Sequence, residues 1–410
     1  MTGPLNGVRV LDLSRILAAP FATQLLGDLG ADVLKVERPG IGDDARQYGP
    51  PFLDNPSGDE PGGAESGFYL STNRNKRSIT IDHSSPAGAE LIRELAAVSD
   101  VLVENYRHGV LDKYGLGYEA ISAVNPRLSY CSVTGFGQDG PYADRAGYDG
   151  VFQAMSGMMS VSGVPDGQPG AGPMKVGVSM VDILTGLYAS SAILAALRDR
   201  DIVTGRGQFI DLALLDCGVA ALSHYAQNFL VSGVAAPRRG NGGFGGIPSQ
   251  AFGCTDGEIF VVASTAGQWS ALADALGRPE LADDPRFATV SARIANRDLV
   301  LETLDSIFAQ RSVSHWASAL EVAGVPVSPV NTMDAVFANP QVRHRGLRTT
   351  VRHPTAGPID LIANPIRYPG TAATTYNPPP LLGEHTDEIL SGVLGKTPDE
   401  VAQLRASGAI

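Results

Sequence analysis

One acidic residue in a long apolar stretch is the first candidate for chemistry. The segment KVGVSMVDILTGLYASSAILAAL, residues 175–197, carries no charge after Lys175 except Asp182. A carboxylate in such surroundings is costly unless it is hydrogen-bonded or used. Asp182 could attack an acyl carbonyl as a nucleophile, or it could be the N-cap of a helix that starts near Ile183. Spacing alone favours the N-cap, and both hypotheses stay open.

A glycine-rich segment could serve the same chemistry. In RRGNGGFGGIPSQ, residues 238–250, Asn241 and Phe244 interrupt the glycines. Glycine backbones can fold over a site and present N–H groups. A lid of this kind would protect an acyl intermediate from water. Read alone, the segment is more typical of a flexible linker.

Basic side chains near the predicted strands are candidates for phosphate contacts, with solvated surface charge as the alternative. They are Lys35, Arg38, Arg74, Lys76 and Arg77. The seven histidines show no metal-ligand spacing, so we expect no metal. The three cysteines form no C-x-x-C pair, which is typical of free thiols in a reducing compartment.

The elements that must position these residues alternate between strand and helix. Apolar runs at 8–13, 31–37, 77–83, 100–106 and 127–137 predict strands, and helical patterns lie between them. This alternation predicts an α/β fold with a parallel sheet. The turn after the first strand, SRILAAP, lacks the glycines that a dinucleotide site needs, which argues against NAD binding.

The second half of the chain has a different pattern of predicted elements. After the glycine-rich stretch, residues 249–264 predict a hairpin that turns at Asp256-Gly257. Helical segments containing Trp269 and Trp316 follow, so residues 250 to about 330 predict a smaller α+β domain. A length of 410 residues fits two domains.

Composition excludes several classes of function. The formal net charge is -12, and both nucleic-acid and anionic-membrane binders need a basic footprint. The N-terminus shows no signal-peptide pattern. The uncharged run from Ile183 to Leu197 is expected to be too short to span a bilayer. We therefore expect a soluble, cytoplasmic protein.

The ordered motifs resemble the class III CoA-transferases of the CaiB/BaiF type, the group of formyl-CoA transferase and carnitine CoA-transferase. The matching pieces run from residue 4 almost to the C-terminus: PLNGVRVLDLSRILAAPFATQLLGDLGADVLKVERPGIGDDAR, NRNKRSITID, DVLVENYRHGVLDKYGLGYE, NPRLSYCSVTGFGQDGPY, GYDGVFQAMSG, VGVSMVDILTGLYA, TGRGQFIDLALLD and PPPLLGEHTDEIL. No single piece is decisive, and the ordered set is highly specific.

The resemblance implies an architecture and a reaction. Residues 1–225 and 331–410 would form a large Rossmann-like domain from both chain ends, and 226–330 a small α+β domain, in an interlocked homodimer. Asp182 would be the catalytic carboxylate, which forms anhydride and aspartyl-CoA thioester intermediates. The partners would be an acyl-CoA and a small carboxylic acid, with no permanently bound cofactor.

The resemblance also implies site residues. The CoA contacts would be Leu17, Ala18, Arg38, Ile81, Asp82, Asn105, Tyr106 and Lys113. The substrate side would comprise Tyr48, Tyr148, Asp149 and the mobile loop Gly242, Gly243, Phe244, Gly245 and Gly246. Three positions differ from formyl-CoA transferase: Leu17 replaces a glutamine, Tyr48 a tryptophan and Lys113 an arginine. Phe244 is an insertion in the glycine loop.

Alternatives remain within and outside this family. Related 2-methylacyl-CoA racemases pair the same aspartate with a histidine, and here Tyr148 holds the position of that histidine. A phenol is a poor proton shuttle near neutral pH, which disfavours a racemase. A non-catalytic CoA-binding protein would use Asp182 only as a helix cap. The segments YDGVFQAMSGMM and VDILTGLYA most resemble dicarboxylate-type members, which often use succinyl-CoA as donor. Arg238 or Arg239 could then contact a distal carboxylate of the acid.

Overall fold

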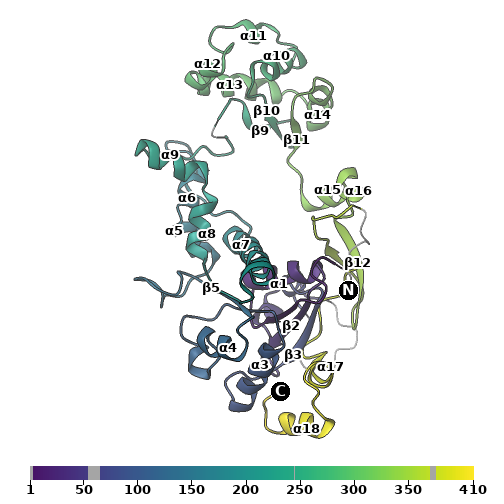
Figure 1. Ribbon diagram of the computed structural model, residues 1–410. Helices are drawn as coiled ribbons and strands as arrows, with labels where there is room; N and C mark the ends of the chain where they lie inside the picture. The colour runs from purple at the N-terminus through teal and green to yellow at the C-terminus, as the bar shows by residue number, and fades with distance from the viewer. Residues whose placement is uncertain (1–2, 54–64, 244, 370–374) are drawn as a thin grey trace. The chain divides into compact units, whose positions relative to one another are not determined.

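The structure, a computed structural model, describes residues 3–53, 65–243, 245–369 and 375–410 (Figure 1). It divides into two compact units. Unit 1 comprises Met1–Met158, Val176–Val234 and Arg345–Ile410, and unit 2 comprises Met159–Lys175 and Ala235–His344. The domain boundaries drawn from the sequence stay a prediction.

Unit 1 is built on a six-stranded parallel sheet with the order β3-β2-β1-β4-β5-β8. Its strands are β1 (Arg9–Asp12), β2 (Asp32–Glu37), β3 (Lys76–Thr80), β4 (Val101–Glu104), β5 (Ser129–Thr134) and β8 (Phe209–Ala213). The central strand β1 aligns Val10 with Val33 on one side and Val101 on the other. The predicted α/β fold with a parallel sheet is confirmed.

Helices cover both faces of this sheet, because alternate strand residues point to opposite sides. Val10 and Val103 pack against α1 (Ala18–Asp28) and α7 (Met180–Asp199). Leu11 and Leu102 lie on the other face, in a core with α3 (Pro86–Ala97), α4 (Tyr118–Val124), α17 (Thr386–Gly392) and α18 (Pro398–Ala406). The other elements of unit 1 are η1 (Asp44–Gln47), α2 (Gly67–Leu70), η2 (Asp112–Tyr114), α5 (Asp149–Met155), η3 (Arg200–Thr204), α8 (Leu214–Ala221), α9 (His224–Ser232), β12 (Arg348–His353) and β13 (Gly357–Ile362), and α6 (Met158–Val161) lies at its boundary with unit 2.

The helix that carries Asp182 is long and apolar. Together with the π-helical turn η3, it runs from Met180 to Thr204 and passes the length and composition test for a membrane span. The helix is thus longer than the uncharged run from Ile183 to Leu197 that lies within it. The core helix of a soluble protein passes the same test, so one such helix does not by itself indicate a membrane span. Here α7 packs closely on α1, since a Cβ at Gly186 would lie 2.6 Å from the carbonyl oxygen of Ala18.

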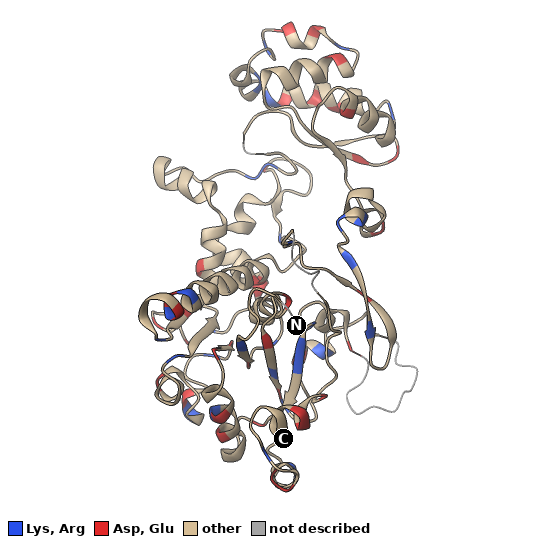
Figure 2. Ribbon diagram, turned by 45° about the vertical axis from the view of Figure 1, so that its right-hand side comes forward, with Lys and Arg blue, Asp and Glu red and all other residues tan. Residues whose placement is uncertain are grey.

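Charged residues lie inside the sheet itself, as the blue and red segments of its strands show (Figure 2). Lys76 Nζ lies 3.0 Å from Asp12 Oδ2, and both side chains are fully buried. Lys35 Nζ lies 2.8 Å from Asp43 Oδ2 and also donates to the carbonyl oxygen of Ser14. A buried charge persists only when it is paired. These pairs therefore fix the turns at the carboxyl ends of β1 and β2.

Unit 2 contains an antiparallel sheet with the order β11-β10-β9. The predicted hairpin is confirmed, with Ser249 opposite Val262 and Gly253 opposite Glu258. Trp269 is buried in a core shared by this sheet and the helices. The elements are β6 (Gly163–Val164), β7 (Gly172–Pro173), β9 (Ser249–Gly253), β10 (Glu258–Val262), α10 (Ala266–Ala275), α11 (Glu280–Asp283), α12 (Val290–Ala295), α13 (Arg297–Phe308), α14 (Val313–Val322), β11 (Val327–Pro329), α15 (Met333–Ala338) and α16 (Pro340–His344).

Candidate active site

Asp182 is the third residue of α7, in its first turn. The helix begins at Met180 and not near Ile183, and its N-cap residue, Ser179, makes no side-chain capping bond. The N-cap hypothesis for Asp182 is therefore wrong. Within the described part of the chain, no donor hydrogen-bonds its partly exposed carboxyl group. The carboxyl group is left available to a ligand.

Asp149 supplies the cap that α7 needs. Its Oδ1 accepts the backbone N–H groups of Val181 at 2.8 Å and of Asp182 at 3.3 Å. Its Oδ2 accepts Nε2 of Gln153 at 2.6 Å. The Oε1 of Gln153 in turn accepts the N–H of Val176, just before the helix. Asp149 was expected on the substrate side, and in the structure its Oδ1 binds the start of α7 and its Oδ2 binds Gln153 of α5. A direct substrate contact by Asp149 stays a prediction.

The carboxyl group of Asp182 has an unusually high pKa. Burial, and then the negative charge of Asp149, raise the pKa of the Asp182 carboxyl to about 7. Strongly perturbed carboxyl groups of this kind are candidates for function. A raised pKa also makes the ionised form a stronger base and nucleophile. Asp182 is therefore partly exposed to a ligand and has the raised pKa that is typical of functional carboxyl groups.

Two tyrosines from distant parts of the sequence lie together on unit 1. Tyr148 precedes α5 and is 70 % exposed, whereas Tyr48 follows η1 and is 44 % exposed. The Tyr48 ring packs edge-on against Phe68, with 5.4 Å between ring centroids. Burial, and then the interaction with Tyr148, raise the pKa of the Tyr48 phenol. Tyr148 directly precedes Asp149, so this exposed pair adjoins the residue that caps the helix of Asp182.

A small pocket lies at the carboxyl ends of β1 to β4, where ligands bind in open parallel sheets. Three predicted CoA contacts, Arg38, Ile81 and Tyr106, line it together. Its other lining residues, which the sequence analysis missed as site residues, are Arg15, Val36, Glu37, Gly42, Asp43 and His83. Arg15 lies in the turn after the first strand, which ends at Asp12, and that position is the signal that could have identified it. The His83 ring packs edge-on against Tyr106, at 5.1 Å between ring centroids.

Other predicted CoA contacts play positioning roles or lie outside the lining. Asn105 clamps the backbone of Arg15: its Oδ1 accepts the Arg15 N–H at 2.9 Å, and its Nδ2 donates to the Arg15 carbonyl at 2.7 Å. Asp82 Oδ1 accepts the N–H and the hydroxyl of Ser84. Lys113 is exposed in η2. Direct contacts of these side chains with CoA stay predictions.

Leu17 and Ala18 lie at the start of α1, the helix that packs against the helix of Asp182. Both are buried where α1 begins. The Ala18 carbonyl packs against Gly186, four residues after Asp182 in α7. Residues four apart lie on one face of a helix. The start of α1 therefore adjoins the face of α7 that carries Asp182.

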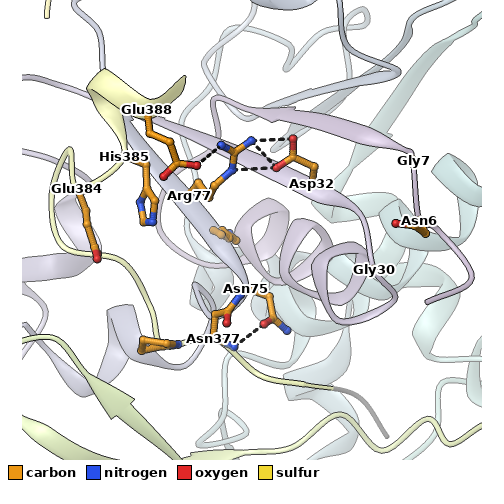
Figure 3. A pocket seen from close by; sticks show the side chains of 12 residues that line it. Asn6, Gly7, Gly30, Asp32, Asn75, Arg77, Asn377, Glu384, His385 and Glu388 are labelled. Atoms are coloured by element: carbon orange, nitrogen blue, oxygen red, sulfur yellow. Dashed lines mark hydrogen bonds and ion pairs between the residues drawn. The ribbon is translucent and has the colours of Figure 1, made fainter. Parts of the chain in front are cut away.

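Most of the basic side chains that the sequence suggested as phosphate contacts form ion pairs with carboxylates. Arg74 forms a buried pair with Asp28, and Lys35 and Lys76 are paired within the sheet. Arg77 bridges Asp32 and Glu388 in a second pocket, at the amino ends of the strands (Figure 3). The ion pairs of Lys35, Arg74 and Lys76 are buried, which disfavours the phosphate hypothesis for these three. The ion pairs of Arg77 are partly exposed, so a phosphate contact by Arg77 stays a prediction. Among the five, Arg38 lines the small pocket at the carboxyl ends of β1 to β4.

The thiols do not compete with Asp182 as nucleophiles. Burial raises the pKa of the Cys131 thiol, and burial likewise raises the pKa values of Cys217 and Cys254. Because the thiolate is the reactive form, a raised pKa makes each of these thiols less reactive near neutral pH. Within the described ranges, no three His, Cys, Asp or Glu side chains cluster in a way that could hold a metal ion.

The glycine segment belongs to unit 2 and has a defined conformation where it is described. The N–H of Gly243 donates to the Ser249 carbonyl at 2.7 Å. A Cβ at Gly246 would lie 2.5 Å from the Ser264 side chain, which explains the need for glycine. Gly242 and Gly245 belong to the same segment, and Phe244 lies outside the described residues. The role of the segment as a lid stays a prediction.

Comparison with known proteins identifies the family. Residues 5–386 match CoA-transferase family III, so this chain belongs to CoA-transferase family III and transfers CoA between an acyl-CoA and a carboxylic acid. It is 45 % identical over 407 residues to a succinyl-CoA:glutarate CoA-transferase of Homo sapiens, covering 99 % of this chain and 90 % of that protein. It is 43 % identical over 388 residues to a succinate–glutarate CoA-transferase of Agrobacterium fabrum, covering 95 % of each. The crystal structure of a CaiB/BaiF family protein from Brucella suis superposes with a TM-score of 0.85 at 42 % identity, covering 96 % of this chain and 100 % of that one.

Proposed function

We propose that this enzyme transfers CoA from succinyl-CoA to a dicarboxylic acid, with Asp182 as the nucleophile. The observation that carries the proposal is the Asp182 carboxyl, which is partly exposed, lacks a hydrogen-bond donor among the described residues and has its pKa raised to about 7. The two relatives above, at 45 % and 43 % identity, exchange CoA between succinate and glutarate, which supports a dicarboxylate acceptor.

The reaction proceeds in four balanced steps. The Asp182 carboxylate attacks the thioester carbonyl, the C–S bond breaks, and an aspartyl–succinyl anhydride and CoA thiolate form. The thiolate attacks the aspartyl carbonyl, which releases succinate and leaves an aspartyl-CoA thioester. The acceptor carboxylate attacks this thioester and expels the thiolate, giving a second anhydride. The thiolate then attacks the acceptor acyl carbonyl, which yields the new acyl-CoA and restores the carboxylate.

The pocket at the carboxyl ends of the strands would hold the CoA nucleotide. Arg38 would contact phosphate, Ile81 and Tyr106 would contact the nucleotide, and Asn105 would hold the Arg15 backbone beside it. Leu17 and Ala18 would line the path toward Asp182, with Asp82 and Lys113 at the rim. Tyr48 and Tyr148 would face the acid, and the glycine segment 242–246 would exclude water from the anhydrides.

The same proposal includes an interlocked homodimer. The helices α7 to α9 present large apolar side chains to solvent, including Leu230 at 74 % and Val231 at 79 % exposure. Exposed apolar patches mark interaction sites, and these side chains are candidates for such a patch. A second copy of the chain covering this surface would explain why these side chains are apolar. Sedimentation at several protein concentrations tests the dimer.

Trapping of the acyl intermediate tests the nucleophile. The protein is incubated with succinyl-CoA, quenched with hydroxylamine and mapped by peptide mass spectrometry, and a hydroxamate on Asp182 is expected. Asp182→Asn should abolish turnover, whereas the control Asp216→Asn, at the third residue of α8, should leave turnover unchanged. An unmodified Asp182 in protein that demonstrably binds succinyl-CoA would overturn the proposal.

A further inference from the structure

One carboxylate holds two arginines at the edge of the nucleotide-side pocket. Asp44 Oδ2 lies 3.0 Å from Nη1 of Arg15, and Asp44 Oδ1 lies 3.1 Å from Nη2 of Arg38. Both arginines line this pocket. The Nε atom of each is buried, and neither has a hydrogen-bond partner among the residues that the structure describes. Two oriented guanidinium groups thus retain unused donors at one site.

Several hydrogen bonds fix the backbone conformation at Arg15 and the next residue. Asn105 binds both its N–H and its carbonyl group. The next residue, Ile16, has a φ of 72°, a left-handed conformation that an isoleucine adopts only when its surroundings impose it. Its N–H donates to Asp43 Oδ1 at 3.0 Å, and the buried Lys35 holds Asp43 in turn. Strain of this kind is typical of functional turns.

The charges around the two arginines leave a net positive site. Asp44 neutralises only one of them, Asp43 is paired with Lys35, and Glu37 is paired with the buried Arg46. The guanidinium of Arg15 also lies 4.9 Å from the centroid of the Tyr106 ring, which limits its motion. Guanidinium groups suit phosphate oxygens through paired, charge-assisted hydrogen bonds.

We infer that Arg15 is a second phosphate-binding residue of the CoA site, which acts with Arg38 on one phosphate group of the nucleotide. The inference rests on the proposed assignment of the pocket to CoA and adds a ligand contact to it. The 3′-phosphate and the 5′-diphosphate of CoA offer the same chemistry, and the experiment separates them.

Binding measurements on the full-length protein test the role of Arg15. Calorimetric titrations use CoA and 3′-dephospho-CoA with the wild type and with Arg15→Gln, Arg15→Lys and Arg9→Gln. Arg9→Gln is the control, because it removes the same charge from an arginine paired with Asp32 at the opposite end of β1. Arg15→Gln should weaken CoA binding about ten- to hundredfold, Arg15→Lys should weaken it less, and Arg9→Gln should leave it unchanged.

The pattern of losses identifies the phosphate. A loss seen with CoA and absent with 3′-dephospho-CoA would assign the 3′-phosphate, and equal losses with both would assign the diphosphate. CoA affinity in Arg15→Gln equal to that of Arg9→Gln would overturn the inference. If Arg15→Gln does not fold, unchanged affinity in Arg15→Lys would overturn it. Failure of the wild type to bind CoA would instead contradict the assignment of the pocket.

Discussion

The backbone N–H of Asp182 donates to the carboxylate of Asp149 at 3.3 Å. Asp149 therefore caps the start of α7 and also acts electrostatically on the side-chain carboxyl group of Asp182. The hydrogen bonds of Asp149 to Val181 and Asp182 fix the first turn of the helix. Its negative charge disfavours ionisation of Asp182. The position and the pKa of the Asp182 carboxyl group are thereby coupled through the side chain of Asp149.

The rate of acyl transfer should follow the ionisation of Asp182. In the proposed mechanism the carboxylate of Asp182 is the attacking form, and its pKa is raised to about 7. On that proposal, kcat/KM for succinyl-CoA should rise with pH and level off above about 7. Steady-state kinetics between pH 5 and pH 9 measure this profile, with Asp216→Asn expected to retain it. A flat profile from pH 5 to pH 8 would contradict the pKa of the site.

Replacement of Asp149 by asparagine should shift that profile. Asp149→Asn retains a carbonyl oxygen for the helix N–H groups and removes the charge that raises the pKa of Asp182, so the midpoint should move to lower pH. Because Asn caps a helix about as well as Asp, the free energy of unfolding should change by less than about 1 kcal/mol. The pH profile and urea denaturation measure the two effects, and an unmoved midpoint would show that burial alone sets the pKa.

Removal of the Asp182 charge should stabilise the protein at high pH. The folded-state pKa of about 7 exceeds the ordinary value of 3.8, so the folded state binds the proton more tightly and the wild type loses stability as pH rises from about 4 to 7. Asp182→Asn, which stays neutral, should therefore melt at a higher temperature than the wild type at pH 8. The difference should vanish near pH 4, and a variant less stable than the wild type at pH 8 would contradict the burial argument.

A methyl group at Gly186 should disturb the contact between α1 and α7. The added Cβ would lie 2.6 Å from the Ala18 carbonyl and 2.9 Å from the Phe21 ring, so Gly186→Ala should destabilise the fold by about 1–3 kcal/mol and raise KM for acyl-CoA. Gly392→Ala is the control, since a Cβ at this helical position in unit 1 meets nothing within 4 Å. Equal stability of the two variants would contradict the close approach of α1 to α7.

Local patterns in the sequence were sufficient for the parallel sheet and for the hairpin at 249–262, because strand periodicity, turn residues and helix signals act over a few neighbouring residues. The same patterns identified Asp182 as an unusual carboxylate, and the ordered motifs identified the family. They placed the start of α7 too late, since the residue that caps it, Asp149, lies 33 positions away in the sequence.

The sequence by itself determined the fold class, the family and the candidate nucleophile. Tertiary structure alone decided which charges are available: it paired Arg74 with Asp28 and Arg77 with Asp32, and it left buried donors of Arg15 and Arg38 beside one pocket. It also placed the side chain of Asn105 in hydrogen bonds with the backbone of Arg15. The physical reason is that hydrogen bonding and burial depend on distances between residues far apart in the chain, and no local pattern of residue types encodes those distances.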